Sequence, residues 1–226
     1  MKMMRKSWVF LVLVLFSTPV ICGQNLSTYR KFSLGASLAS ISKQVGQDPG
    51  QSKLIHQRPA VIQQLVYWPI PTSSYSSRAE SVSQVLFSFY DGELYKIAVT
   101  YHGDATQGLT EDDMVQAISA RYGTATRFYP EIQLPTNDEY APKETAIARW
   151  EDSRTSVDIS RSESLNTFEL DVFSRALEIK AQAATAESLR LEKQEAPQKE
   201  IDRQKSEADK LEVARQKNIK AFASSG

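Results

Sequence analysis

The chain has 226 residues, with 27 lysines and arginines against 27 aspartates and glutamates, and 41% of its residues are hydrophobic. This composition is that of an ordinary globular protein with room for one or two domains. Residues 1–23 carry three basic residues and no acid, which leaves 24 basic against 27 acidic residues in the rest of the chain. A slightly acidic chain does not fit a nucleic-acid-binding protein, because such proteins bind mainly by neutralising phosphates.

The residues that usually carry catalysis or metal binding are scarce and scattered. Cys22 is the only cysteine, which excludes an intrachain disulfide and a cysteine-rich metal site. His56 and His102 each lie outside any metal-site or catalytic-triad spacing. The acidic clusters Glu111–Asp113 and Glu151–Asp152 fit a helix start and a tight turn. We therefore expect no catalytic residue, no cofactor and no metal, and a protein that is not an enzyme.

Residues 1–23 have the layout of a secretory signal peptide. The basic segment Met1–Lys6 precedes the unbroken apolar run Trp8–Phe16, and polar and proline residues end that run. The stretch Trp8–Ile21 is shorter than the ~20 residues that a helix needs to span a bilayer. We expect cleavage after Cys22 or after Gly23, and export to the periplasm or the outside.

Two alternatives for this segment stay open, an uncleaved anchor and a lipid attached to Cys22. The lipobox of bacterial lipoproteins has leucine three residues before the cysteine and a small residue directly before it. Pro19 and Ile21 occupy those places here. These are the only routes by which we expect the chain to contact a membrane.

The composition of the chain changes near residue 185. Residues 24–184 contain 34 charged residues in 161, whereas residues 185–226 contain 17 in 42, nine basic and eight acidic. We therefore expect a folded body over residues 24–184 and a charged helical tail over residues 185–226.

The first half of the body has the pattern of a helix, a strand and a hairpin. Hydrophobic spacing predicts a helix over Leu34–Gly46, with Ser37 as its N-cap and the glycine as its stop. Gln47–Lys53 is predicted to be a loop, and Ala60–Trp68 is predicted to be a strand.

The segment Ser83–Tyr101 carries the clearest local pattern of the chain. Two alternating runs flank Asp91-Gly92, a pair that favours the two-residue turn of a hairpin. The alternation places three residues on one face of each strand: Val85, Phe87 and Phe89 on the first, and Tyr95, Ile97 and Val99 on the second.

The second half repeats this order. A helix over Leu109–Gly123 is predicted, with Thr110 as its N-cap and Asp113 in the fourth place of a capping box. Pro130–Pro142 is predicted to be a loop. Three short strands are expected after it: Thr145–Trp150, Ser156–Arg161 and Thr167–Phe173.

Written as elements, each half is α-β-β-β, which suggests two pseudo-repeats over residues 32–103 and 109–173. We expect an α+β fold with antiparallel strands, as one sheet or two, and with the helices on one face. A long charged C-terminal helix follows. The face of the sheet without helices would then be open to a partner.

Short motifs in the first half of the body are similar to motifs of a known fold. Leu34–Ser37 leads into the first helix, Gly46 ends it, Trp68 ends the next strand, and Phe89–Leu94 has the form F-x-x-G-x-L/V. In these respects the chain resembles the tandem α/β repeats of the beta-lactamase inhibitory protein fold and of outer-membrane assembly lipoproteins of the SmpA/OmlA type. The resemblance covers roughly residues 32–103 and, less clearly, 109–173. It implies a non-catalytic, protein-binding function, although the lipidated cysteine of the lipoproteins has no well-formed match.

The tail is predicted to be helical in two parts. Ser174–Glu195 carries a narrow stripe at helical spacing, namely Leu177, Ala181, Ala184, Ser188 and Leu191, whose alanines suit close packing on the body or on a partner helix. Pro197 is expected to interrupt the helix, and Gln198–Phe222 to form a weakly amphipathic second part. This second part is either a solvated, partly frayed helix, or a short coiled coil or docking helix.

The function that these patterns favour is binding of another envelope or secreted protein. Candidate partner-binding residues are Tyr90, Tyr95 and Tyr101 on the hairpin, and Leu211 and Ile219 in the tail. The hairpin aromatics either form a platform on the open face of the sheet or, as we expect, divide about equally between the core and the sheet surface. The alternatives are a small-ligand carrier, which needs an apolar cavity between sheet and helices, and a hydrolase that uses carboxylates alone.

Overall fold

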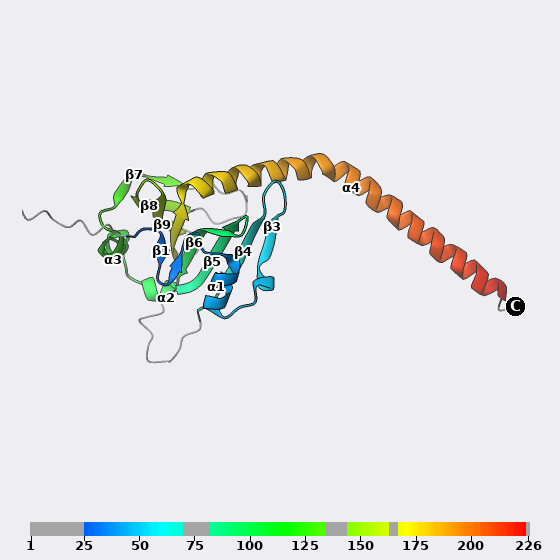
Figure 1. Ribbon diagram of the computed structural model, residues 1–226, viewed down its shortest axis with the longest axis horizontal. Helices are drawn as coiled ribbons and strands as arrows, with labels where there is room; N and C mark the ends of the chain where they lie inside the picture. Colours follow the sequence, from blue (N-terminus) through cyan, green and yellow to red (C-terminus); the bar gives the residue numbers. More distant parts are fainter. Residues whose placement is uncertain (1–24, 70–81, 134–143, 163–166, 225–226) are drawn as a thin grey trace, which may run out of the picture.

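The computed structural model describes residues 25–69, 82–133, 144–162 and 167–224, so the expected signal peptide and most of the expected loop Pro130–Pro142 lie outside the described residues. The fold is α+β, as expected: one large antiparallel sheet, a small two-stranded sheet, short helices and a long C-terminal helix (Figure 1). The small sheet pairs β1 (Thr28–Tyr29) with β2 (Phe32–Ser33).

Each half of the body begins with a helical segment and continues with four strands. The first half contains α1 (Leu38–Val45), the 3₁₀ turn η1 (Pro49–Gln51), β3 (Lys53–His56), β4 (Ile62–Tyr67), β5 (Val82–Tyr90) and β6 (Glu93–Tyr101). The second half contains the short α2 (Gly103–Thr106), α3 (Glu111–Tyr122), β7 (Thr126–Gln133), β8 (Glu144–Glu151), β9 (Thr155–Ser162) and β10 (Thr167–Ser174). The helix α4 (Arg175–Ser224) completes the chain.

The eight strands β3 to β10 form a single sheet in the order β3-β4-β5-β6-β10-β9-β8-β7. The two halves meet where β6 pairs with β10, with Val99 opposite Leu170. The sheet therefore has one more strand in each half than the six-strand expectation.

The two additional strands, β3 and β7, are the edges of the sheet. The expected loop Gln47–Lys53 is wrong at its last residue, because β3 begins at Lys53. The expected loop Pro130–Pro142 is wrong over residues 130–133, because β7 continues to Gln133. An edge strand pairs on one side only, so its alternation is weak, and β7 contains Pro130, which only an edge strand tolerates.

The helix ends and the hairpin turn form as the sequence predicts. Ser37 accepts a hydrogen bond from the Ser40 amide at 3.2 Å at the start of α1. Thr110 and Asp113 form a reciprocal capping box at the start of α3. Asp91 and Gly92 both have positive φ angles, 49° and 84°, as a two-residue hairpin turn requires.

The main core lies between one face of the sheet and the helices α1 and α3. Ile41 of α1 is fully buried in it, and the Phe32 ring meets the Phe87 ring edge-on at 4.8 Å. Trp150 on β8 is 1% exposed and donates its indole N–H to the carbonyl of Gly123 at 2.8 Å, which ties the end of α3 to the sheet.

Candidate functional site

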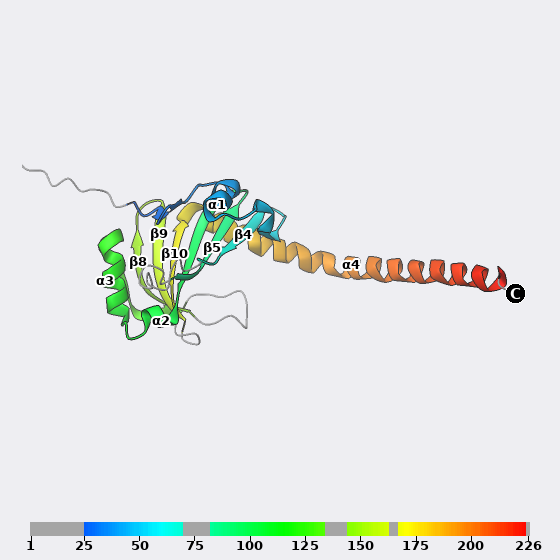
Figure 2. The same ribbon diagram turned by 90° about the horizontal axis from the view of Figure 1, so that it is seen from below.

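The face of the sheet that we expected to be open is covered over the first half of the molecule by α4. Figure 2 shows α1 in front of the strands and α4 behind them. The buried side of α4 carries Ala181 and Ala184, which pack in one cluster with Ala60, Ile62 and Tyr95. The small-residue stripe predicted from the sequence is therefore the surface with which α4 packs on the body.

The three hairpin tyrosines do not form one platform, and the expectation that Tyr95 shares a face with Ile97 and Val99 is wrong. In β6 the register places Leu94 opposite Phe89 and Lys96 opposite Ser88, which leaves Tyr95 as an extra residue. Such a bulge changes the face to which a side chain points.

The consequence of the bulge is that Tyr95 faces α4 and is 8% exposed, whereas Ile97 and Val99 face the main core. Tyr90 is half-buried beside the α4 cluster. Tyr101 is half-buried against the main core, on the opposite face of the sheet.

Polar contacts fasten α4 to the edge strand β3 and the loop after it. The Nδ1 atom of His56 lies 2.9 Å from the Ser188 hydroxyl, which also donates to Glu192 at 3.2 Å. Arg58 donates twice to the Glu195 carboxylate, at 2.9 Å each. This bidentate contact lowers the pKa of Glu195 below its ordinary value.

The grouping of His56, Ser188 and Glu192 is not a catalytic triad. A serine-hydrolase relay uses the two opposite nitrogens of the imidazole, one for the serine and one for the acid. Here Nδ1 faces both Ser188 at 2.9 Å and Glu192 at 3.7 Å, and Ser188 is 5% exposed. The arrangement therefore joins α4 to β3, which no spacing in the sequence indicated.

Beyond Glu195 the helix leaves the body altogether. It continues through Pro197 to Ser224, so the expected interruption at the proline is wrong. Every residue from Ala196 to Ser224 is exposed. At 1.5 Å per residue, this stretch extends about 43 Å from the body (Figure 1).

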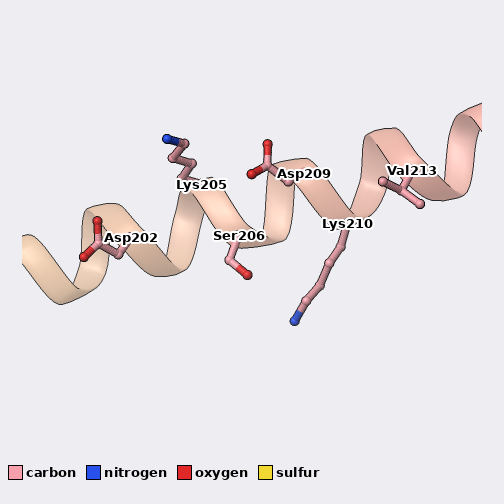
Figure 3. Close-up of a pocket in the computed structure, with 6 residues that line it drawn as sticks. All are labelled: Asp202, Lys205, Ser206, Asp209, Lys210 and Val213. Carbon is pink, nitrogen blue, oxygen red and sulfur yellow. The ribbon is translucent and has the colours of Figure 1, made fainter.

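Both candidate residues of the tail lie on this projecting stretch. Leu211 is 71% exposed and Ile219 is 50% exposed. Figure 3 shows a neighbouring part of the helix, whose side chains, among them Asp202, Lys205 and Lys210, leave the helix in several directions. Only residues of α4 line the hollow between them among the described residues, so this region is an open helix surface.

A charged groove of about 450 Å³ lies beside α4 on the second half of the sheet. In it Lys96 pairs with Asp171 at 2.7 Å, and Arg149 forms a bidentate pair with Asp158 at 2.6 and 2.7 Å. Burial opposes the charge of Lys96, but the Asp171 carboxylate outweighs this effect and raises the lysine pKa.

The groove was missed in the sequence because its members come from four strands and a helix. The alternating pattern of β10 gave the only local signal, because it places Glu169 and Asp171 on one face. Asp158 and Asp171 are each held in an ion pair that links neighbouring strands. The carboxylate-dependent hydrolase stays an untested alternative.

The described residues contain neither a metal-binding cluster nor a membrane-spanning helix. No group of three or more histidine, cysteine or acidic side chains is placed to hold a metal ion there. Within the same residues, no helix has both the length and the apolar character to cross a membrane. In the comparisons with known proteins, no family model, no curated protein and no solved structure matches the chain, so the resemblance drawn from its motifs stays a prediction.

Proposed function

We propose that this is an exported, non-catalytic protein that binds another protein of the cell envelope or the secreted fraction through the projecting half of α4. The observation that carries the proposal is the stretch Ala196–Ser224, every residue of which is exposed. An isolated helix is marginal in water, because most helical stability in proteins comes from packing of an apolar face. A partner would supply that packing.

Four of the five large apolar residues of the projecting stretch lie along one side of the helix, together with Ala208, and Val213 lies on the other side. Successive spacings of 7, 3, 8 and 3 residues separate the five residues on the first side, so at 100° per residue they span about 80° of the helix circumference. These stripe residues are Ile201, Ala208, Leu211, Ile219 and Phe222. A stripe this narrow fits a second amphipathic helix packed in a short coiled coil.

The charge on this stripe favours a different protein over a second copy of the chain. Arg215 lies between Leu211 and Ile219 on the same side of the helix. In a parallel pair of identical helices it would face its own counterpart, and like charges at such a position repel. The partner that fits is a helix with apolar residues along the stripe and an acidic residue opposite Arg215.

The test is site-specific photo-crosslinking in cells that express the full chain. A photoreactive residue at Leu211 is compared with one at Val213, which is equally exposed at 71% but lies on the other side of the helix. We expect one foreign protein to crosslink from position 211 and not from 213. Equal crosslinking from both positions, or adducts only between copies of the chain, would refute the proposal.

Purified components then measure the contribution of the stripe. We expect Leu211→Asp to weaken binding of the crosslinked protein by about 10-fold or more, because a charge replaces a buried apolar contact. Val213→Asp is the matched control and leaves affinity within about two-fold. Equal losses in both variants would contradict the stripe.

A further inference from the structure

A second cavity lies on the opposite face of the sheet from α4, with a volume of about 350 Å³. Its apolar walls come from α3, the segment before it and the centre of the sheet: Leu109, Met114, Ile118 and Leu170. Its polar side comes from β1 and the residue after it, from β6 and from the end of α3: Tyr29, Arg30, Tyr101, Arg121 and Tyr122. Apolar walls with a few converging polar groups are typical of small-molecule sites.

The tyrosines of this cavity are held as neutral hydrogen-bonding groups. Burial raises the pKa of Tyr29, Tyr101 and Tyr122 above the ordinary value, so all three phenols keep their proton at neutral pH. Tyr122 donates to the carbonyl of Thr28 at 2.9 Å, which fixes β1 against α3.

The arginines give the cavity a positive edge. The Arg121 guanidinium lies 5.3 Å from the centre of the Tyr122 ring and 5.9 Å from that of Tyr29, and it donates to the Thr28 carbonyl at 3.3 Å. The Arg30 guanidinium lies 5.6 Å from the centre of the Tyr29 ring. The described residues that line the cavity include no aspartate or glutamate. An anionic group at this edge would therefore meet the Arg121 guanidinium, with no acidic side chain among the described lining residues.

We propose that this cavity binds a small amphiphilic anion, with one carboxylate at the arginine edge and an apolar chain or ring against α3 and β10. The carboxylate suits the planar donor fork of an arginine. The apolar part gains from removal of its surface from water against Met114, Ile118 and Leu170. This ligand site is independent of the projecting half of α4, because it lies on the face of the sheet opposite the half of α4 that packs on the body.

The test is calorimetric titration of the full chain with three probes that share a ten-carbon chain: decanoate, decanol and decyltrimethylammonium. We expect decanoate to bind with one site per chain and the cationic probe not to bind, because the edge is positive. Decanol should bind about 10-fold or more weakly than decanoate, since it lacks the charge-assisted hydrogen bonds. No binding of decanoate, or equal binding of the cation, would overturn the proposal.

Two variants assign the binding to this cavity. Arg121→Gln removes a cation of the edge and should weaken decanoate binding about 10-fold or more, while decanol affinity stays within about two-fold. Ala117→Trp places a large ring at the exposed rim of the cavity and should abolish binding of both probes. Arg190→Gln, on the exposed side of α4, is the matched control. Decanoate binding that survives both cavity variants would show that the site lies elsewhere.

Discussion

Replacement of Tyr95 by alanine tests whether α4 is part of the folded body. The Tyr95 side chain is 8% exposed and lies in the cluster that joins β6 to Ala181 and Ala184. Truncation of a buried aromatic residue to alanine costs about 3–5 kcal/mol, from lost burial and from the cavity left behind. We expect about 3 kcal/mol for Tyr95→Ala, because this cluster is small and lies at the surface of the body.

The assay is urea unfolding followed by circular dichroism, combined with hydrogen exchange of the α4 backbone. We expect a lower free energy of unfolding and faster exchange between Leu177 and Glu195, since the lost ring is what the helix packs against. Tyr95→Phe is the matched control, because it keeps the ring and removes only the hydroxyl. Stability within about 0.5 kcal/mol of the parent, with unchanged protection of α4, would refute the assignment of Tyr95 to the core.

Three further predictions concern charge, pH and the tail. Lys96→Met should lower the free energy of unfolding by about 2 kcal/mol, measured in urea, because it leaves the Asp171 carboxylate unpaired in a half-buried groove. Burial raises the pKa of Tyr29, Tyr101 and Tyr122, so the folded chain binds more protons than the unfolded chain above about pH 10. Stability is therefore complete below that pH and falls as pH rises through the raised values, and thermal unfolding across alkaline pH should show this loss reduced in Tyr101→Phe. Deletion of residues 197–226 should change the free energy of urea unfolding by less than about 0.5 kcal/mol, since the described part of that stretch is exposed throughout.

Local features of this fold were predictable where a short stretch of sequence determines the geometry. The Ser37 and Thr110 caps each depend on residues within one helical turn. The Asp91-Gly92 turn depends on two adjacent residues that adopt positive φ angles. The stripe from Leu177 to Leu191 follows from helical period alone, and the structure confirms that its three central residues, Ala181, Ala184 and Ser188, are buried.

The candidate site was less predictable because it depends on contacts between distant segments. The bulge at Tyr95 is set by the pairing of β5 with β6, and one extra residue moved that ring to the other face. The sequence left open whether the α4 stripe packs on the body or on a partner helix. Contacts such as Arg58 with Glu195 join residues more than a hundred positions apart, which no local pattern could indicate.

The two halves of α4 have different physical roles, and the boundary between them is marked by Glu195 and Pro197. Up to Glu195 the helix is held by Arg58 and by the buried alanines, so the body fixes its direction. Pro197 lacks the amide hydrogen that would complete the next helical bond, and its ring crowds the preceding turn. Figure 1 shows α4 changing direction after it leaves the sheet, as a proline inside a helix commonly causes. The direction of the projecting half is therefore set by the docked half. Substitutions at Ala181 should alter the free energy of unfolding and the direction of the projecting half of α4. Substitutions at Leu211 should alter only the binding of the proposed partner.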